Sequence, residues 1–398
     1  MSTRAPLLAT VAVLALFAGV TGIQLAYTLA YTLGLLLLVA WLWARLVSRR
    51  LRVERESPEG SFSVGEPFAE RFTVRNGSAL PIAYCEVRDG SRLPGYAPGR
   101  ACALKPGEAV SWSARGAFAE RGRHHFGPLE AQVGDPFGLF PRTVRAGAQR
   151  SVLVHPALHP VEEIAPVWGG SSGGDSRHGR VHDVPPDVAT VREYQPSDGQ
   201  SRIHWASTAR TGRLMSRSYD THNRADLLVV LDLHSGIHAG RGADSSLEYA
   251  VSVAASICSA SLRRGQAVGL VTNDLNCTAF GAGRGEAQRL RLLDYLAEAR
   301  DNGDVSLAET IVRHSRGWRG RGGLVVVTGS HDPSWVDNLL DAGVRGQRHL
   351  AVLVDPVSFG APGTLMKVNA AWRVALDWWL IHRGDQLGAP HATLTAAR

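Results

Sequence analysis

Lysine is almost missing from this chain of 398 residues. Lys105 and Lys367 are the only two, so arginine supplies 41 of the 43 basic side chains. A GC-rich genome explains this bias, because arginine codons are GC-rich. A functional explanation beside it is a basic protein surface that faces anionic lipid headgroups. The net charge is +7, yet no basic platform interleaved with aromatic residues occurs. The composition therefore does not favour nucleic-acid binding, which would show a steep salt dependence.

Cysteine is also scarce. The four cysteines show neither C-x-x-C pairing nor the spacing of zinc ligands; they are Cys85, Cys102, Cys258 and Cys277. This excludes a disulfide framework and is typical of free thiols in a reducing compartment. We expect Cys258 on a buried helix face.

Familiar catalytic motifs are absent. The chain contains no G-x-S-x-G elbow, P-loop, H-E-x-x-H or Cys–His pattern. The glycine-rich stretch 281–285 precedes a helical pattern and could cradle a phosphate, but it lacks the spacing of a nucleotide fingerprint, and a loop with a glycine turn is favoured. We expect no cofactor and no catalytic residues.

Charge is missing entirely from Ala5 to Ala44. One helix crosses a bilayer core with roughly 20 residues, so this stretch predicts two short spans, 5–22 and 25–45, within a hairpin of residues 1–50. Arginines precede the first span and follow the second, whereas the turn between them has none. The positive-inside rule then predicts a multi-pass protein of the inner (plasma) membrane with both termini and the soluble domains in the cytoplasm.

A cleaved signal peptide ahead of a single span is the alternative. The arginines after the second span oppose export of the body, and no A-x-A-like cleavage site follows the first span. The sequence therefore favours two retained spans.

Residues 51–160 show a period of two. In Phe68–Asn76 and Val110–Phe118 apolar side chains alternate with polar ones, and turn residues bound both runs. Shorter strands are expected at 83–88, 129–133 and 152–155. Several strands without an intervening helix pattern predict a small β-sandwich-like domain.

Two segments of this domain are less ordinary: the hairpin 120–128, with His124 and His125, and the turn Asp135-Pro136-Phe137-Gly138-Leu139-Phe140. Metal binding by the histidines and Asp135 is disfavoured, because adjacent residues of a strand point to opposite faces. A turn that packs the two domains is the favoured interpretation.

Residues 161–185 are rich in glycine and serine and predict a flexible linker. From 186 to 398 a dense polar segment leads into an α/β body. Apolar strands are expected at 227–233, 267–272, 323–328, 350–354 and 378–381, and helices at 245–264, 285–299, 307–314 and 335–342. Ser245 and Glu248 form a capping box. The alternation predicts a doubly wound, mostly parallel sheet, with ligands bound in the loops after Leu233 and Thr328.

The polar segment, the arginine–glycine hairpin and the 135–140 turn together resemble the bacterial family called domain of unknown function 58, over nearly the whole chain. The matching residues of the segment are Arg192, Tyr194, Asp198, Arg202, Trp205, Ala209 and Arg210. The family usually has Gly-Asp where Ser197-Asp198 stands, and an acidic or amide residue in place of His204.

The resemblance implies a C-terminal von Willebrand factor A-like domain and a gene neighbourhood with MoxR-type AAA+ ATPases. The expected partners are therefore such an ATPase, other von Willebrand A-like membrane proteins and the lipid bilayer. Arginine and tyrosine or tryptophan suit a protein interface, so the signature residues are candidates for partner binding; an internal network joining linker and sheet is a compatible alternative.

In such domains Asp-x-Ser-x-Ser after the first strand, with later threonine and aspartate, often binds a divalent cation, and hard cations want several oxygen ligands. Here the first motif reads Asp232-Leu233-His234-Ser235-Gly236, and the later one Thr328-Gly329-Ser330. Asp232 is retained, but His234 and Gly236 replace both serines. The sequence predicts no tight Mg²⁺ site, with Asp332 as a substitute ligand only after a loop shift. A soft-metal site from Asp232, His234 and His238 is disfavoured.

The leading hypothesis is a non-enzymatic, membrane-anchored adaptor that partners a MoxR-type AAA+ ATPase in chaperone-like assembly of client proteins. A membrane-associated hydrolase, or another enzyme with an unrecognised active site, is the alternative.

Overall fold

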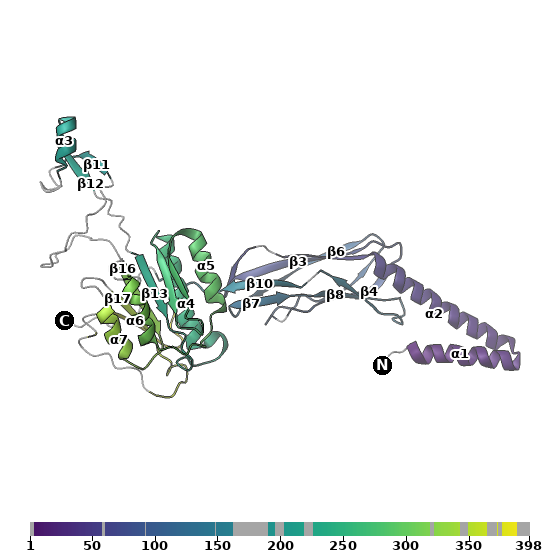
Figure 1. Ribbon diagram of the computed structural model, residues 1–398. Helices are drawn as coiled ribbons and strands as arrows, with labels where there is room; N and C mark the ends of the chain where they lie inside the picture. Colours follow the sequence, from purple (N-terminus) through teal and green to yellow (C-terminus); the bar gives the residue numbers. More distant parts are fainter. Residues whose placement is uncertain are drawn as a thin grey trace. The chain divides into compact units, whose positions relative to one another are not determined.

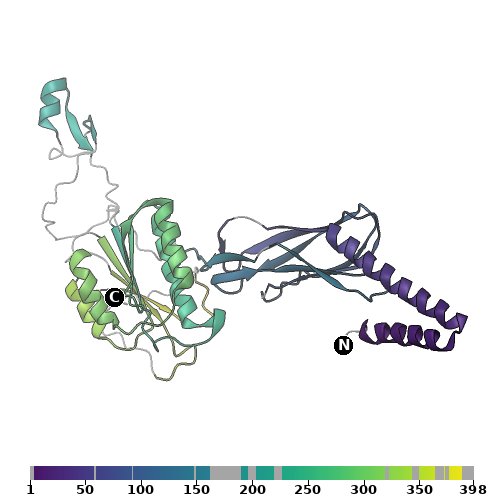
Figure 2. The ribbon, with the colours of Figure 1, turned by 45° about the vertical axis from the view of Figure 1, so that its right-hand side comes forward.

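The computed structural model describes residues 4–57, 60–91, 93–147, 149–161, 190–195, 203–218, 226–318, 322–342, 349–363, 372 and 376–387. The chain divides into two compact units, Met1–Ala157 and Leu158–Arg398. Figures 1 and 2 show the elements of each unit.

The first unit begins with two antiparallel helices, α1 (Arg4–Thr21) and α2 (Gln24–Arg50). Gly22 allows the sharp turn between them, because its φ of +68° lies in the left-handed region. α2 is long and apolar enough to cross a membrane, whereas the apolar part of α1, Pro6–Thr21, is shorter. The two predicted spans correspond to two helices, but among the described residues only one is a candidate membrane helix by length and composition. The predicted multi-pass topology is therefore not supported by this criterion.

The β domain continues from α2 without a loop, and its three sheets are small. The first is β1 (Leu51–Glu56), β3 (Pro67–Asn76) and β6 (Ala109–Ala117), all antiparallel. The second is β5 (Arg100–Leu104), β4 (Ile82–Asp89), β8 (Leu129–Val133) and β9 (Arg142–Ala146). The third joins β2 (Phe62–Ser63), β10 (Arg150–His155) and β7 (Gly122–Phe126).

The alternating side chains of these strands form one core. Phe72 and Val74 of β3 pack with Val87 of β4 and Ala131 of β8, all buried. Alternation places every second residue on the same face of a strand, so the sheets turn their apolar faces toward one another. The predicted β-sandwich-like arrangement is present, and β1, β2, β5, β7 and β9 add to the predicted strands.

The second unit contains a six-stranded sheet in the order β15-β14-β13-β16-β17-β18, parallel except for β15. Its strands are β13 (Asp226–Leu231), β14 (Val268–Thr272), β15 (Ala279–Gly283), β16 (Gly322–Thr328), β17 (His349–Val354) and β18 (Asp377–Ile381). Its helices are η3 (Gly242–Asp244), α4 (Ser246–Arg263), α5 (Gly285–Glu298), α6 (Leu307–Trp318) and α7 (Ser334–Ala342).

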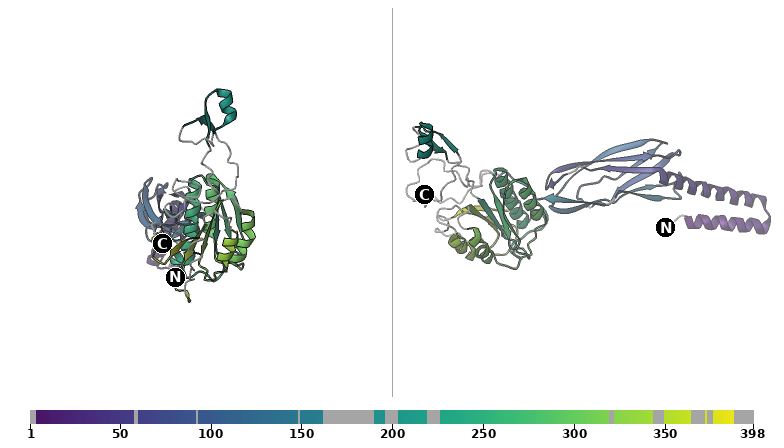
Figure 3. Two further views of the ribbon diagram at one scale, coloured as in Figure 1. Left: turned by 90° about the vertical axis from the view of Figure 1, so that its left-hand side faces the viewer. Right: turned by 45° about the horizontal axis from the view of Figure 1, so that its top comes forward.

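Helices cover both faces of this sheet (Figures 1 and 3). Leu227 and Val229 of β13 pack in the core that contains α4 and α5, whereas Leu228 and Val230 pack with α6 and α7. A strand buried on both faces reads as a continuous apolar run, which is why 227–231 lacks polar residues. The predicted doubly wound sheet is confirmed, although β15 replaces the loop expected around Gly281.

The boundary between the units lies earlier than predicted. The first unit ends at Ala157, three residues before the predicted end of the β domain at 160. Val161, the predicted first residue of the linker, is fully buried and packs with Leu158 in the core of the α/β unit. The rest of the predicted linker, 162–185, lies outside the described residues.

Candidate functional site

The chain leaves β13 at the centre of the sheet, between β14 on one side and β16 on the other. In open α/β sheets, such a switch point at the carboxyl ends of the strands is where ligands bind. Asp232 follows β13 directly and Thr328 ends β16, so both predicted residues reach this position.

The Asp232 carboxylate is buried and already hydrogen-bonded. Its side chain accepts three hydrogen bonds: from Thr328 Oγ1 to Oδ2 at 2.6 Å, and from Asn273 Nδ2 and the His234 amide to Oδ1 at 2.8 and 3.2 Å. Asp232 is 1% exposed, and Asn273 and Thr328 are fully buried. Hydrogen-bond donors, rather than further oxygen ligands, therefore face this carboxylate.

Neighbouring loops are tied to the same point. Asn273 accepts a 2.5 Å hydrogen bond from the Leu233 amide and donates another to the Val305 carbonyl. His238 makes ring-nitrogen hydrogen bonds to the Asp232 carbonyl at 3.0 Å and to Ser246 Oγ at 3.2 Å. Sequence reasoning missed Asn273, whose position just after β14 is the signal that could have found it. These contacts cross-link the loops after β13, β14 and β16.

The remaining metal candidates have other roles in the structure. Gly236 is exposed, with a φ of +85° that disfavours a serine there. Asp332 instead caps α7, accepting hydrogen bonds from the Ser334 amide and hydroxyl at 3.0 and 2.7 Å; these bonds lower the pKa of Asp332. Among the described residues no group of three or more His, Cys, Asp or Glu side chains could hold a metal ion. The donors around Asp232 thus do not fit a hard-cation site, and weak Mg²⁺ binding stays a prediction.

The described signature residues lie in or next to a small element that we call the signature module: β11 (Thr190–Glu193), α3 (Trp205–Thr211) and β12 (Met215–Ser218). The two strands pair antiparallel. The Tyr194 amide donates to the Leu214 carbonyl at 2.8 Å, which extends the ladder. His204 caps α3, its Nδ1 accepting a hydrogen bond from the Ser207 amide. His204 stands where the family commonly has an acidic or amide residue, and it serves here as the N-cap of α3.

The module exposes apolar and basic side chains. Trp205 is 66% and Leu214 is 47% exposed, and Arg210 is exposed on the same short helix as Trp205. For Arg192 the structure describes the backbone of β11 only, and Asp198 and Arg202 lie outside the described residues. The internal network predicted for Asp198 is therefore not tested.

A buried ionic cluster in the β domain was not anticipated. Arg55 donates to Glu70 through Nε at 3.0 Å and Nη2 at 2.5 Å, and its Nη2 lies 3.3 Å from Asp89. Tyr96 also donates to Glu70. Opposite charges at inward-facing positions of two alternating strands were the sequence signal for this pair.

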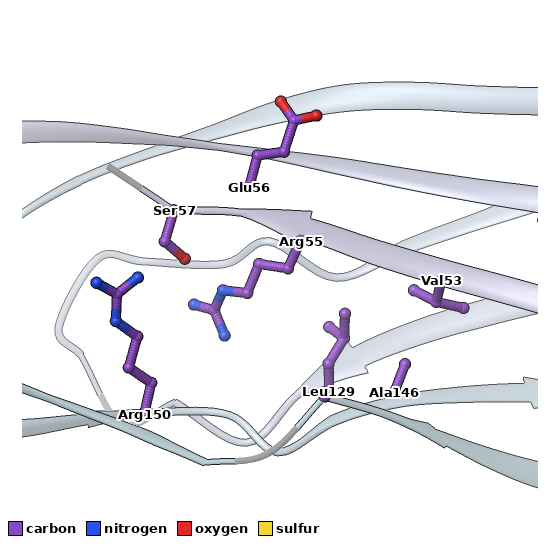
Figure 4. Close-up of a pocket in the computed structure, with 8 residues that line it drawn as sticks. Val53, Arg55, Glu56, Ser57, Leu129, Ala146 and Arg150 are labelled. Atoms are coloured by element: carbon purple, nitrogen blue, oxygen red, sulfur yellow. The ribbon is translucent and has the colours of Figure 1, made fainter. Parts of the chain in front are cut away.

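The same arginine lines a pocket of about 460 Å³. Figure 4 shows Arg55 and Arg150 extending into this space from different strands. Glu70 and Asp89 balance the charge of Arg55, and Arg150 is the other cation among the lining residues. Glu56 and Ser57 also line the pocket, and the Ser57 hydroxyl donates a hydrogen bond to Glu70.

Comparison with known proteins agrees with the resemblance inferred from the sequence. Residues 190–363 match the model of the family "Protein of unknown function DUF58", which spans the signature module and most of the α/β unit. "Uncharacterized protein YeaD" of Bacillus subtilis is 26% identical over 310 residues, covering 73% of each chain. Residues 190–363 of this chain are therefore similar to the DUF58 family.

Solved structures match only a part of the chain. The CARDB domain of PF1109 from Pyrococcus furiosus covers 26% of this chain and 94% of its own, with 18% identity and a TM-score of 0.20. A FixG-related protein from Vibrio parahaemolyticus covers 26% of this chain and 96% of its own, with 9% identity and a TM-score of 0.19. TM-scores this low do not define a shared fold.

Proposed function

We propose that this protein is a membrane-anchored adaptor whose cytoplasmic signature module docks a partner, an AAA+ ATPase of MoxR type, in the chaperone-like assembly of client proteins. The observation that carries the proposal is the exposed Trp205, at 66%, on a module whose sequence belongs to the family match. The proposal contains no catalytic step.

The anchor in this proposal is the helix pair α1 and α2, inserted as a hairpin into the inner (plasma) membrane. α2 has 27 residues, about 40 Å of helix at 1.5 Å per residue, which exceeds a hydrocarbon core of about 30 Å. Leucine and valine side chains of α2 are widely exposed, as lipid-facing side chains must be. Arg49 and Arg50 end the helix and favour a cytoplasmic position for the β domain, which begins at Leu51.

The α/β unit is, in this proposal, von Willebrand A-like. Support comes from the parallel strand order around β13, with an aspartate after the first strand and a threonine at the end of β16. The aspartate and threonine bond each other rather than presenting free oxygen atoms. We propose that this site works as a structural clasp, so that partner contacts come from the surface and not from a bound cation.

The exposed side chains of the module are suited to binding a protein. Tryptophan and arginine are enriched among interface residues whose truncation costs most binding energy. Arg210 and Arg213 are exposed beside Trp205 and Leu214, and Arg213 forms only a long 3.8 Å pair with Glu193. An acidic surface with an apolar pocket complements this arrangement. Other von Willebrand A-like membrane proteins are further candidate partners.

The test is co-purification of the tagged full-length chain from detergent-solubilised membranes of its own host. The proposal expects an AAA+ protein to enrich over a mock control. It expects Trp205→Ala and Arg210→Glu each to reduce that enrichment about tenfold or more, as interface anchors do. Arg313→Glu is the matched control, because Arg313 is exposed on α6 of the same unit and pairs only with Glu309. Absence of an AAA+ protein, or equal loss with all three variants, would contradict the proposal.

A further inference from the structure

The turn between β8 and β9 holds one phenyl ring in solvent. Both oxygens of the Asp135 carboxylate accept backbone hydrogen bonds, Oδ2 from Phe137 at 3.0 Å and Oδ1 from Phe140 at 2.6 Å. Gly138 completes the turn with a φ of +72°. Asp135 is 5% exposed, whereas Phe137 is 63% exposed. The turn is thus built around a buried carboxylate, and its aromatic tip does not pack into the β domain. The interpretation of this turn as an element that packs the two domains stays a prediction.

This turn lies at the α2 end of the β domain. β4 and β8 pair antiparallel with Cys85 opposite Val133, so the residues after Val133 lie beside the start of β4. There the Pro81 carbonyl accepts a hydrogen bond from Trp43 Nε1 of α2 at 3.3 Å. Val47 of α2 belongs to the same core as the strands. Figure 1 shows the C-terminal part of α2 meeting this end of the domain.

The apolar helix pair ends close to Trp43 and Pro81. A Cβ built at Gly34 lies 3.9 Å from Val11 of α1, which fixes the register of the two antiparallel helices. Equal rise along both helices then places the first residue of α1, Arg4, level with about Trp41. Arg45 stacks its guanidinium over the Trp41 ring at 5.2 Å. Tryptophan and arginine together are typical of the headgroup region, so the interface lies beside Trp43 and Pro81.

Cations surround this end of the domain. Arg52 of β1 and Arg75 of β3 are exposed and directly opposite each other in the ladder. Like charges so placed destabilise a sheet unless an anion lies near them. Arg49, Lys105 and Arg142 also lie on the segments that meet here, and Glu108 is the acidic residue of the adjoining loop, where its carboxylate accepts from the Lys105 amide.

We infer that the 135–140 turn is a second membrane contact: Phe137 inserts into the headgroup region of the leaflet that α2 enters, and the surrounding arginines bind anionic lipid. This inference rests on the proposed anchorage through α2. The chemistry is that of an interfacial anchor, an apolar side chain within a basic surface. The contact fixes the tilt of the β domain on the membrane, because α2 and the turn are two separate points of attachment.

Photocrosslinking of the full-length chain in phosphatidylethanolamine vesicles containing phosphatidylglycerol tests this. Benzoylphenylalanine replaces Phe137 in one variant, Leu38 of α2 in a second and Ala119, at the opposite end of β6, in a third; Leu38 and Ala119 are both exposed. Lipid adducts are measured by mass spectrometry. The inference expects adducts at 137 comparable with those at 38 and about tenfold above those at 119.

The three positions separate the two claims. Adducts at 38 with none above background at 137 would overturn the inference and leave the anchor intact. No adducts at either position would remove the anchorage on which the inference rests. Unchanged adducts at 137 when phosphatidylglycerol is omitted would contradict the part assigned to the arginines. Thermal unfolding of Phe137→Ser, which should match the wild type because the ring is exposed, checks that the turn itself stays folded.

Discussion

Thr328 Oγ1 donates a 2.6 Å hydrogen bond to Asp232 Oδ2 across the two central strands of the α/β sheet. The two residues are 96 positions apart in the chain and both are buried. A buried carboxylate without partners costs free energy, and here a hydroxyl, an amide side chain and a backbone amide all point at it. Asp232 and Thr328, the candidate cation ligands of the sequence motifs, are thus hydrogen-bonded to each other.

Thr328→Val keeps the shape of the side chain and removes the donor to Asp232, together with the acceptor of the Ser330 amide. Leaving a buried acceptor short of one partner should lower the free energy of unfolding by about 1–3 kcal/mol. Denaturant unfolding of the full-length chain in detergent measures this. Ser330→Ala, in the partly exposed turn after β16, is the control and should change little. Equal stability of Thr328→Val and wild type would show that the hydrogen bond is not formed.

Magnesium or manganese should give no Asp232-dependent heat in calorimetric titration of the protein. The reason is the donor set: Asn273 and the His234 amide present N–H groups to Oδ1, where a cation would need oxygen ligands. Asp232→Asn is the matched variant. A micromolar signal that disappears in this variant would overturn the prediction.

Arg55→Met should strongly destabilise the β domain. The substitution leaves Glu70 and Asp89 without their buried cation, and breaking such a pair costs about 3–5 kcal/mol. Arg88→Met removes the arginine of a surface pair with Glu86 and serves as the control. Thermal unfolding should show a large drop for Arg55→Met and none for Arg88→Met, and similar drops for both would refute the buried-cluster argument.

Mild acid should destabilise the α/β unit through His349. Burial holds the pKa of His349 below its ordinary value of 6.5, and among the described residues its Nδ1 has no hydrogen-bond partner. The unfolded chain therefore binds the proton more readily, so stability is full above that value and is lost as the pH falls through it. His349→Gln should flatten this part of the stability–pH curve, with the exposed His125→Gln as control. An unchanged slope would exclude His349 as the cause.

The hydrophobic pattern revealed most of the elements. Several strands of the β domain show alternation, and the central strands of the α/β sheet appear as continuous apolar runs. Ser245 is confirmed as the N-cap of α4: its hydroxyl accepts a hydrogen bond from the Glu248 amide. The buried Cys258 is also confirmed, and burial raises the pKa of its thiol to about 12. Short edge strands such as β5 and β15 were not predicted, because a strand of five mostly exposed residues shows little alternation of apolar and polar side chains.

The site was harder to foresee from the sequence. Motif spacing identified Asp232 and Thr328. The hydrogen bonds that Thr328 and Asn273 donate to Asp232, however, depend on which strands become neighbours in the sheet. Likewise, Arg55 and Glu70 are 15 residues apart and meet only through the β1–β3 ladder. The exposed state of Phe137 depends on a buried carboxylate two residues earlier, which no pattern of hydrophobicity encodes.

The proposed anchorage of the chain, with its folded units in the cytoplasm, is tested most directly by a reporter pair fused in turn to the C-terminus. A fluorescent protein that matures in the cytoplasm and a phosphatase that works only after export are compared in the membrane fraction. The account predicts fluorescence in the membrane fraction and background phosphatase activity. Strong phosphatase activity, or fluorescence in the soluble fraction, would contradict it.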